Sequence, residues 1–320
     1  MKTKIVYVLT SSEKDYYLEQ MIISMHSLKM HNPDAKISLV VDDKTAESFV
    51  GKREGVKAYV DELKVIPLDS NFSQKERSRI MKTSLRDYLE GDYLFIDTDT
   101  VIAGDLSDID SFTFDIGAVL DKHIPIQNHD SKIAIENYAR KMGWDIPANG
   151  HYFNSGVMYV KDNGLTHKFY ATWRENWTRG QAEHGIAIDQ PSMALTNAQL
   201  GYIITEIPGA YNCQILYNGL KYLIDAKIIH YFASNMRKWD CAYLFRDKAI
   251  YESVKTSGVT QEIEDRIANA KSAFTDKCTI LGGNQCDAYG SVISGFGRRI
   301  VQRFGNLSTK IDKWYWTHKK

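Results

Sequence analysis

The first 42 residues contain the pattern that most restricts the fold, a buried strand, a helix and a second buried strand in succession. Residues 4–9 (Lys-Ile-Val-Tyr-Val-Leu) and 37–41 (Ile-Ser-Leu-Val-Val) are apolar and rich in β-branched side chains, as buried strands are. Between them, residues 16–31 place leucine, isoleucine and methionine at helical spacing, and Asn32-Pro33 ends the helix. This order predicts a parallel sheet with a nucleotide-sized crevice at the carboxyl ends of its strands.

Further apolar runs predict that the same α/β sheet continues to about residue 230. The expected strands are 93–96, 116–120, 157–160, 203–207 and 228–230, and the expected helices are 73–89, 134–142, 168–177, 190–198 and 260–274. The composition shifts near residue 250. We therefore divide the chain into an α/β domain over residues 1–250 and a C-terminal extension over 251–320, helical at first and then basic and aromatic.

The balance of charge argues against one class of function. The 320 residues carry 40 basic and 40 acidic side chains, and a chain this neutral is a poor candidate for a nucleic-acid binder. We find no signal peptide and no apolar run near the roughly 18 to 20 residues that a membrane-spanning helix needs. The four cysteines lack CxxC spacing, so we expect free thiols. These features predict a cytoplasmic protein without a nucleic-acid partner.

The tripeptide Asp97-Thr98-Asp99 directly follows an expected strand and is the strongest chemical signal in the sequence. Two carboxylates at this spacing can reach one hard cation, and Mg²⁺ and Mn²⁺ commonly bridge such carboxylates to substrate phosphates. A structural alternative is a polar turn that closes the strand. An enzymatic alternative is a haloacid-dehalogenase-like phosphatase, with Asp97 as nucleophile and Asp99 as acid/base. That motif normally lies on a chain's opening strand, whereas two β-α units precede it here.

Three later positions carry polar side chains beside expected strands or helices. Asn154, ahead of Ser155 and Gly156, could hydrogen-bond a sugar hydroxyl, although a turn before a strand explains the run equally well. Asp189 precedes Gln190 and a proline, so it could cap a helix or grip sugar hydroxyls, with the Gln190 amide beside the anomeric carbon. His230 ends a strand and could ligate a metal, although a lone histidine there is more often structural.

Taken together and in this order, the motifs resemble glycosyltransferase family 8, the group of glycogenin and the lipopolysaccharide galactosyltransferases. The resemblance covers residues 4–240 and implies the GT-A fold, an α/β Rossmann-like mixed sheet flanked by helices. It implies a metal-dependent, retaining transfer of a hexose, with glucose or galactose favoured, from a UDP-sugar to a lipopolysaccharide, capsule or other surface glycan or glycolipid. The matching positions are residues 4–12, Lys82, Asp97-Thr98-Asp99, Asp121, residues 153–157 (Phe-Asn-Ser-Gly-Val), Asp189-Gln190, residues 208–212 and His230.

The resemblance also implies a role for each matching residue. Asp97, Asp99 and His230 would hold Mn²⁺ or Mg²⁺ on the UDP diphosphate. The uridine site would be lined by Leu9, Thr10, Ser11 and Tyr16, the donor contacted by Arg79, Lys82 and Thr98, and the transferred sugar surrounded by Asp121, Asn154, Asp189 and Gln190. We expect front-side attack, in which the leaving diphosphate oxygen deprotonates the acceptor hydroxyl. Asp189 as a transient covalent nucleophile is the alternative.

One segment departs from the family pattern. The family usually has Gly at the third position after the histidine, followed by Lys, Pro and Trp. Residues 233–239 here are Ala-Ser-Asn-Met-Arg-Lys-Trp, so we assign the phosphate-binding cation to Lys238. A protein that binds a nucleotide-sugar without turning it over is the non-enzymatic alternative. The complete set of matching residues argues against it, because an inactive site tends to lose some of them.

The last 28 residues, 293–320, mix seven arginines and lysines with phenylalanine, tryptophan and tyrosine. Basic and aromatic side chains together suit the surface of an anionic membrane, which predicts peripheral contact with the inner face of the cytoplasmic membrane. The alternative is a C-terminal helix docked on the core. Residues 122–150 lie between two expected strands near the sugar site, and we expect them to shape the acceptor site.

Overall fold

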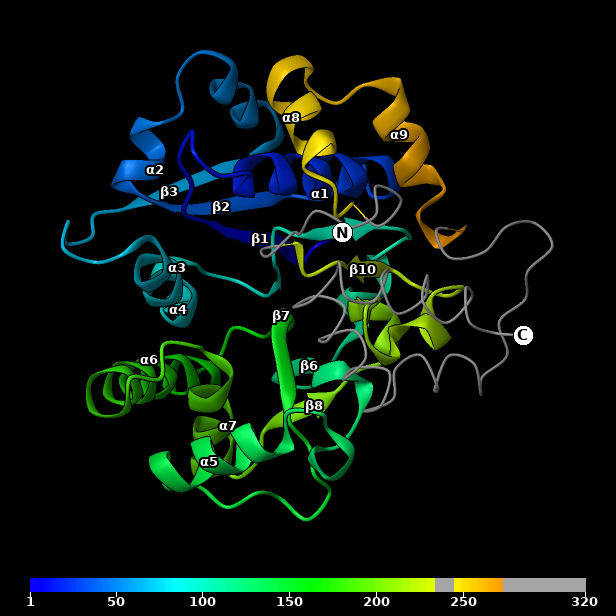
Figure 1. The fold of residues 1–320 in the computed structure, drawn as a ribbon. Helices are drawn as coiled ribbons and strands as arrows, with labels where there is room; N and C mark the ends of the chain where they lie inside the picture. Colours follow the sequence, from blue (N-terminus) through cyan, green and yellow to red (C-terminus); the bar gives the residue numbers. More distant parts are fainter. Residues whose placement is uncertain (234–244, 273–320) are drawn as a thin grey trace, which may run out of the picture.

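The computed structural model describes residues 1–233 and 245–272, which form a mixed α/β structure built on a seven-stranded sheet (Figure 1). Its strand order is β3-β2-β1-β4-β7-β6-β8. The strands are β1 (Lys4–Leu9), β2 (Ile37–Asp42), β3 (Glu62–Ile66), β4 (Tyr93–Ile96), β6 (Ile116–Leu120), β7 (Phe153–Val160) and β8 (Ile204–Glu206). This architecture confirms the predicted fold class.

The N-terminal half of the sheet is parallel, as the strand-helix-strand order predicts. β1 pairs in parallel with both β2 and β4, and β2 pairs in parallel with β3. The side chains of Ile5, Tyr7 and Leu9 join one hydrophobic cluster, whereas those of Val6 and Val8 join another. Helix α1 (Tyr17–His31) covers the first face, and α3 (Gln74–Thr83) with α6 (Gly164–His184) covers the second. A strand covered on both faces needs an unbroken apolar sequence.

The C-terminal half of the sheet contains the antiparallel strand β7, which makes the sheet mixed. β7 is antiparallel to both β4 and β6, while β6 and β8 are parallel. It begins at Phe153, four residues earlier than the sequence predicts, so Asn154, Ser155 and Gly156 belong to the strand and not to a turn before it. The register between β6 and β7 shifts between Ala118 and Leu120, next to the carboxyl end of β6.

The helix expected over residues 73–89 is two helices. Ser73 and Glu76 form a capping box at the start of α3. Ser84, at φ −117° and ψ 14°, leaves the helical conformation and separates α3 from α4 (Leu85–Tyr88). The remaining helices are α2 (Asp43–Glu47), α5 (Lys132–Met142), α7 (Gln190–Gln199), α8 (Lys248–Ser257) and α9 (Gln261–Ala268). Among the described helices, none is both long enough and apolar enough to cross a membrane.

A second, three-stranded sheet stands beside the carboxyl end of β4. It consists of β5 (Thr100–Ile102), β10 (Ile228–His230) and β9 (Cys213–Gln214), with β10 in the middle. Its hydrophobic cluster also takes in Ile250, Tyr251 and Ile263 of α8 and α9. The division that we placed at residue 250 therefore falls inside α8, and residues 251–272 pack into the core of the preceding domain.

Candidate active site

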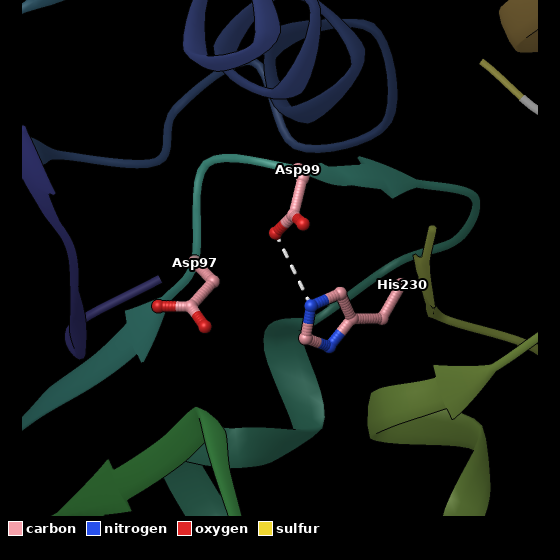
Figure 2. Close-up of side chains that lie close together, drawn as sticks. All are labelled: Asp97, Asp99 and His230. Carbon is pink, nitrogen blue, oxygen red and sulfur yellow. Dashed lines mark ion pairs between the residues drawn. The ribbon is translucent and has the colours of Figure 1, made fainter. Parts of the chain in front are cut away.

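Asp97, Asp99 and His230 converge where the two sheets meet (Figure 2). Asp97 follows β4, Asp99 lies just before β5, and His230 ends β10, which pairs with β5. One ligand atom from each of the three residues lies within 4.8 Å of the others. His230 Nε2 is 3.2 Å from Asp99 Oδ1. The backbone N–H groups of Asp97 and Tyr231 donate to the carbonyl oxygens of Gly156 (2.7 Å) and Asp99 (3.0 Å), which fixes the three chain segments together.

The three side chains fit a divalent cation. Two carboxylates and one imidazole suit Mn²⁺ and also Mg²⁺, which prefers the oxygens. Gly156 of β7 leaves the space between them open. A Cβ atom there would lie 2.5 Å from His230 Cε1 and 2.9 Å from Asp97 Oδ2, closer than real contacts allow. Burial, opposed by Lys82, raises the pKa of Asp97, because two carboxylates and little water share this space.

A cluster of charged side chains adjoins Asp97, and we call Arg79, Lys82, Ser155 and Asp189 the charged cluster. Asp189 Oδ1 is 3.1 Å from Arg79 Nε, and its Oδ2 is 3.1 Å from Lys82 Nζ and accepts from Ser155 Oγ at 2.8 Å. Lys82 Nζ also lies 3.2 Å from Asp97 Oδ1. Burial alone would raise the pKa of Asp189, but Arg79, Lys82 and Ser155 hold it well below its usual range. The Asp189 carboxylate is therefore ionised, with both oxygens engaged.

Asp121 lies on the other side of β7, directly after β6. Its Oδ1 accepts from Asn154 Nδ2 at 2.8 Å and its Oδ2 is 3.0 Å from His129 Nε2. Burial opposes ionisation, but the contacts with His129 and Asn154 hold the pKa of Asp121 below its usual value. The next two residues, Lys122 (φ 56°) and His123 (φ 58°), adopt left-handed conformations that non-glycine residues rarely take. The backbone therefore changes direction directly after Asp121.

The two ends of the Asp189-Gln190 pair have different partners. Asp189 is the N-cap residue of α7 by position, but its side chain makes no capping hydrogen bond. The alternative that Asp189 caps the helix with its side chain is therefore wrong, because its carboxylate contacts Arg79, Lys82 and Ser155 instead. Gln190 Nε2 donates to the backbone oxygen of Phe153 at 3.2 Å, next to Asn154. The structure thus brings Asp121, Asn154, Asp189 and Gln190 around the first residues of β7.

The residues predicted for the uridine site lie at the carboxyl end of β1 but differ in orientation. The side chain of Leu9 packs in the hydrophobic core. Thr10 and Ser11 are buried and hydrogen-bonded, Ser11 Oγ donating to Asp15 at 2.7 Å. The ring of Tyr16 stacks on Tyr251 at 6.2 Å. Thr98 is half-buried between the two metal-site aspartates, and Lys238 lies outside the described residues.

Tyr17, Asn212 and Ser155 contribute to the site although the sequence assigned them no separate role. Burial and then the carboxylates of Asp15 and Asp99 raise the pKa of Tyr17, so Tyr17 lies within electrostatic reach of the metal-site residue Asp99. Asn212 contacts both Asn154 and His230. Ser155 and Asn212 lie inside runs that match the family resemblance, so that resemblance was the available signal.

A mixed sheet of this order, with an Asp-x-Asp pair after β4 and a histidine at the end of β10, is typical of glycosyltransferases with the GT-A fold. Residues 8–241, more than two thirds of the chain, match the model of Glycosyl transferase family 8. The chain belongs to this family. The family assignment also sets aside the phosphatase alternative, which shares with it only the Asp97-Thr98-Asp99 run.

Two solved structures of the galactosyltransferase LgtC share the fold. The galactosyltransferase LgtC in complex with donor and acceptor sugar analogs is 15% identical, with a TM-score of 0.51, over 82% of this chain and 100% of that one. An active-site mutant of LgtC gives 14% identity and a TM-score of 0.52 over the same shares. Mouse xyloside xylosyltransferase 1 is 12% identical, with a TM-score of 0.49, over 74% of this chain and 100% of that one. No curated protein sequence matches the chain.

Proposed function

We propose that the protein transfers a hexose from a UDP-sugar to a surface glycan with retention of anomeric configuration. We call Asp97, Asp99 and His230 the metal triad. The observation that carries the proposal is that this triad, the charged cluster and Asp121 converge on residues 154–156 of β7. Asp97, Asp99 and His230 would hold Mn²⁺ or Mg²⁺, which neutralises charge that develops on a departing diphosphate. Around this point, Asp121, Asn154 and Gln190 supply the hydrogen-bonding groups that a sugar ring requires.

The charged cluster favours front-side attack over a covalent intermediate. A nucleophilic Asp189 would need a free oxygen facing the anomeric carbon, but Arg79 engages one oxygen and Lys82 with Ser155 engages the other. We propose that Asp189 orients Arg79 and Lys82 and, through a remaining lone pair, accepts a hydrogen bond from a sugar hydroxyl. Arg79 and Lys82 then lie within reach of both the donor and Asp97. The acceptor hydroxyl would lose its proton to the leaving diphosphate oxygen.

The test is UDP release from a panel of UDP-sugars, with Mn²⁺ or with EDTA, for the wild type and Asp99→Ala. Enzymes of this kind hydrolyse their donor slowly without acceptor, so the donor is identified before the acceptor. We expect release from one UDP-hexose, with glucose or galactose favoured, and its loss with EDTA and with Asp99→Ala. Asp34→Ala removes an exposed aspartate and is the matched control. Release that persists in EDTA would contradict the metal-dependent mechanism.

We propose that the acceptor is a lipopolysaccharide, capsule or other surface glycan or glycolipid, and that the enzyme meets it at the inner face of the cytoplasmic membrane. This part of the proposal rests on the basic and aromatic sequence of residues 293–320, which lie outside the described residues. Each cation near an anionic surface contributes about 1 kcal/mol. Co-sedimentation with phosphatidylglycerol vesicles, with and without residues 293–320, tests it. Equal pelleting of the two forms would rule out membrane contact through this tail.

A further inference from the structure

An unbroken series of buried hydrogen bonds joins Asp121 to the metal triad, and we call Asp121, Asn154, Asn212 and His230 the amide relay. Asn154 Nδ2 lies 2.8 Å from Asp121 Oδ1, and Asn212 Nδ2 lies 3.0 Å from Asn154 Oδ1. His230 Nδ1 lies 3.1 Å from Asn212 Oδ1. All four residues are buried, with at most 8% of their surface exposed, so little water competes for these bonds.

The direction of each hydrogen bond in the relay is determined by groups that have only one possible role. An ionised carboxylate such as Asp121 only accepts, so Asn154 must turn its NH₂ group toward it. The backbone N–H of Gly156 only donates, and it points at Asn154 Oδ1 from 2.9 Å. These two neighbours agree on the orientation of the Asn154 amide. Asn212 must then present its NH₂ group to Asn154 and its oxygen to His230.

We infer that Asn212 is a positioning residue, which accepts the Nδ1 proton of His230 and thereby leaves the Nε2 lone pair for the metal. We infer further that Asp121 dictates this arrangement through Asn154, so that the sugar side and the metal side of the site are coupled. The His230 ring is also held in plane, because it stacks on Phe232 at 4.0 Å and 9°. Partners of this kind fix the tautomer and the orientation of a ligating histidine.

The inference rests on the proposed function at one point, that His230 ligates a divalent metal. Its first test measures Mn²⁺ affinity directly, from the electron paramagnetic resonance signal of free Mn²⁺, without donor or acceptor. We expect Asn212→Ala to bind Mn²⁺ about 10- to 100-fold more weakly. Asn176→Ala, which removes another buried amide bonded to Thr196 and Gln199, is the matched control and should bind like the wild type.

Three outcomes of this titration have different meanings. Absence of Mn²⁺ binding by the wild type would overturn the proposed metal-dependent function itself. Wild-type affinity in Asn212→Ala would overturn only the positioning role of Asn212. Asn212→Asp keeps an acceptor opposite His230 Nδ1 at nearly the same size but loses the donor to Asn154 Oδ1, so its affinity should lie between those of the alanine variant and the wild type. A loss as large as in the alanine variant would assign the effect to packing and overturn the inference.

A double-mutant cycle tests the coupling to Asp121. Asp121→Asn replaces a group that can only accept with an amide that can also donate, which leaves the Gly156 N–H as the one remaining neighbour of the two that fix the Asn154 amide. We expect Mn²⁺ to bind at least about twofold more weakly. Asp121→Asn also removes a negative charge near the metal site, which would weaken Mn²⁺ binding by electrostatics alone. That electrostatic effect would be the same in the Asn212→Ala background. The relay effect should vanish in the Asn212→Ala background. Equal effects of Asp121→Asn in both backgrounds would overturn the coupling.

A second readout needs no metal and guards against variants that bind poorly because they fold poorly. In the wild type without metal, the Nδ1 proton of His230 should give a slowly exchanging, downfield resonance in the ¹H–¹⁵N spectrum. His230→Asn assigns the resonance by removing it. Asn212→Ala should lose it while the remaining backbone spectrum stays folded, and Asn212→Asp should restore it. A resonance unchanged in Asn212→Ala would overturn the inference.

Discussion

The charged cluster and the amide relay lie on opposite faces of β7 and approach the same triad by different physical means. Consecutive residues of a strand point to opposite faces, so Ser155 enters the charged cluster and its neighbour Asn154 enters the amide relay. Lys82 of the charged cluster contacts Asp97, and the relay ends on His230, which contacts Asp99. One short strand thus supports both sides of the triad.

The two groups differ in what they can control. Coulomb attraction acts over distance and depends little on angle, so Arg79 and Lys82 can serve Asp189 and a charged donor in turn. Hydrogen bonds between amides are directional, so the relay fixes which atom of His230 faces the triad. We conclude that the charged cluster suits the balancing of charge, whereas the relay suits the setting of orientation. Substitutions in the two groups should therefore differ in size and in kind.

The largest loss in the free energy of unfolding is expected from a substitution in the charged cluster. Lys82→Met leaves the half-buried carboxylate of Asp97 and the buried carboxylate of Asp189 without their shared cation, although Arg79 stays beside Asp189. Removing one partner of a buried ion pair costs about 3–5 kcal/mol, and the remaining Arg79 favours the lower end of this range. Urea unfolding of the variant should show this loss. Lys221→Met, at an exposed lysine, is the control and should change the unfolding free energy by less than about 0.5 kcal/mol. Equal losses in both variants would contradict the comparison.

A smaller loss in the free energy of unfolding is expected from a substitution in the amide relay. Asn154→Ala removes the hydrogen bonds to Asp121, Asn212 and Gly156. The only buried charge among these partners is that of Asp121, and it still has a polar neighbour. Asp121 keeps His129. A buried polar group that loses its partner costs about 1–3 kcal/mol. Urea unfolding should thus place Asn154→Ala between the wild type and Lys82→Met. A loss larger than that of Lys82→Met would reverse our ranking of the two groups.

Gly156→Ala should affect metal binding more than stability. The added methyl group would lie 2.5 Å from His230 Cε1 and 2.9 Å from both Asp97 Oδ2 and Asn154 Oδ1, so these side chains must shift. Overpacking of this kind costs about 1–3 kcal/mol. Their displacement separates the ligands, so Mn²⁺ affinity should fall at least about tenfold. Gly164→Ala, where the added atom meets nothing within 4 Å, is the control for both measurements.

The sequence predicts those parts of the fold and site that depend on local pattern. The β1-α1-β2 order follows from hydrophobic periodicity, and Asp97, Asp99 and His230 lie next to strands that the same periodicity places. Ser84 was not foreseen as a helix break, because serine is tolerated within helices and its conformation here depends on the packing of α4. Local pattern thus gives the elements and the residues at their ends.

The parts that could not be predicted depend on register and on distant partners. Asn154 and Ser155 became strand residues because β7 pairs with β4 and β6 across a register shift that no local pattern records. Asn154 and Asn212 are separated by 58 positions in the chain, and their contact exists only after both sheets have formed. The ring of Tyr16 stacks on Tyr251, which belongs to a helix near the far end of the described chain, so this contact too is invisible to local pattern.

The smallest effect concerns pH and tests whether the charge of Asp189 stabilises the fold. Its pKa in the folded protein is depressed, so ionisation contributes stability that is fully present above the pKa of the unfolded chain, about 3.9. That contribution is lost as the pH falls from there toward the lower folded value, at no more than about 1.4 kcal/mol per pH unit. The difference in unfolding free energy between wild type and Asp189→Asn should be constant from pH 8 to about 5 and shrink below about 4. A difference that stays constant down to pH 3 would mean that Asp189 acts through its hydrogen bonds, as the amide relay does, and not through its charge.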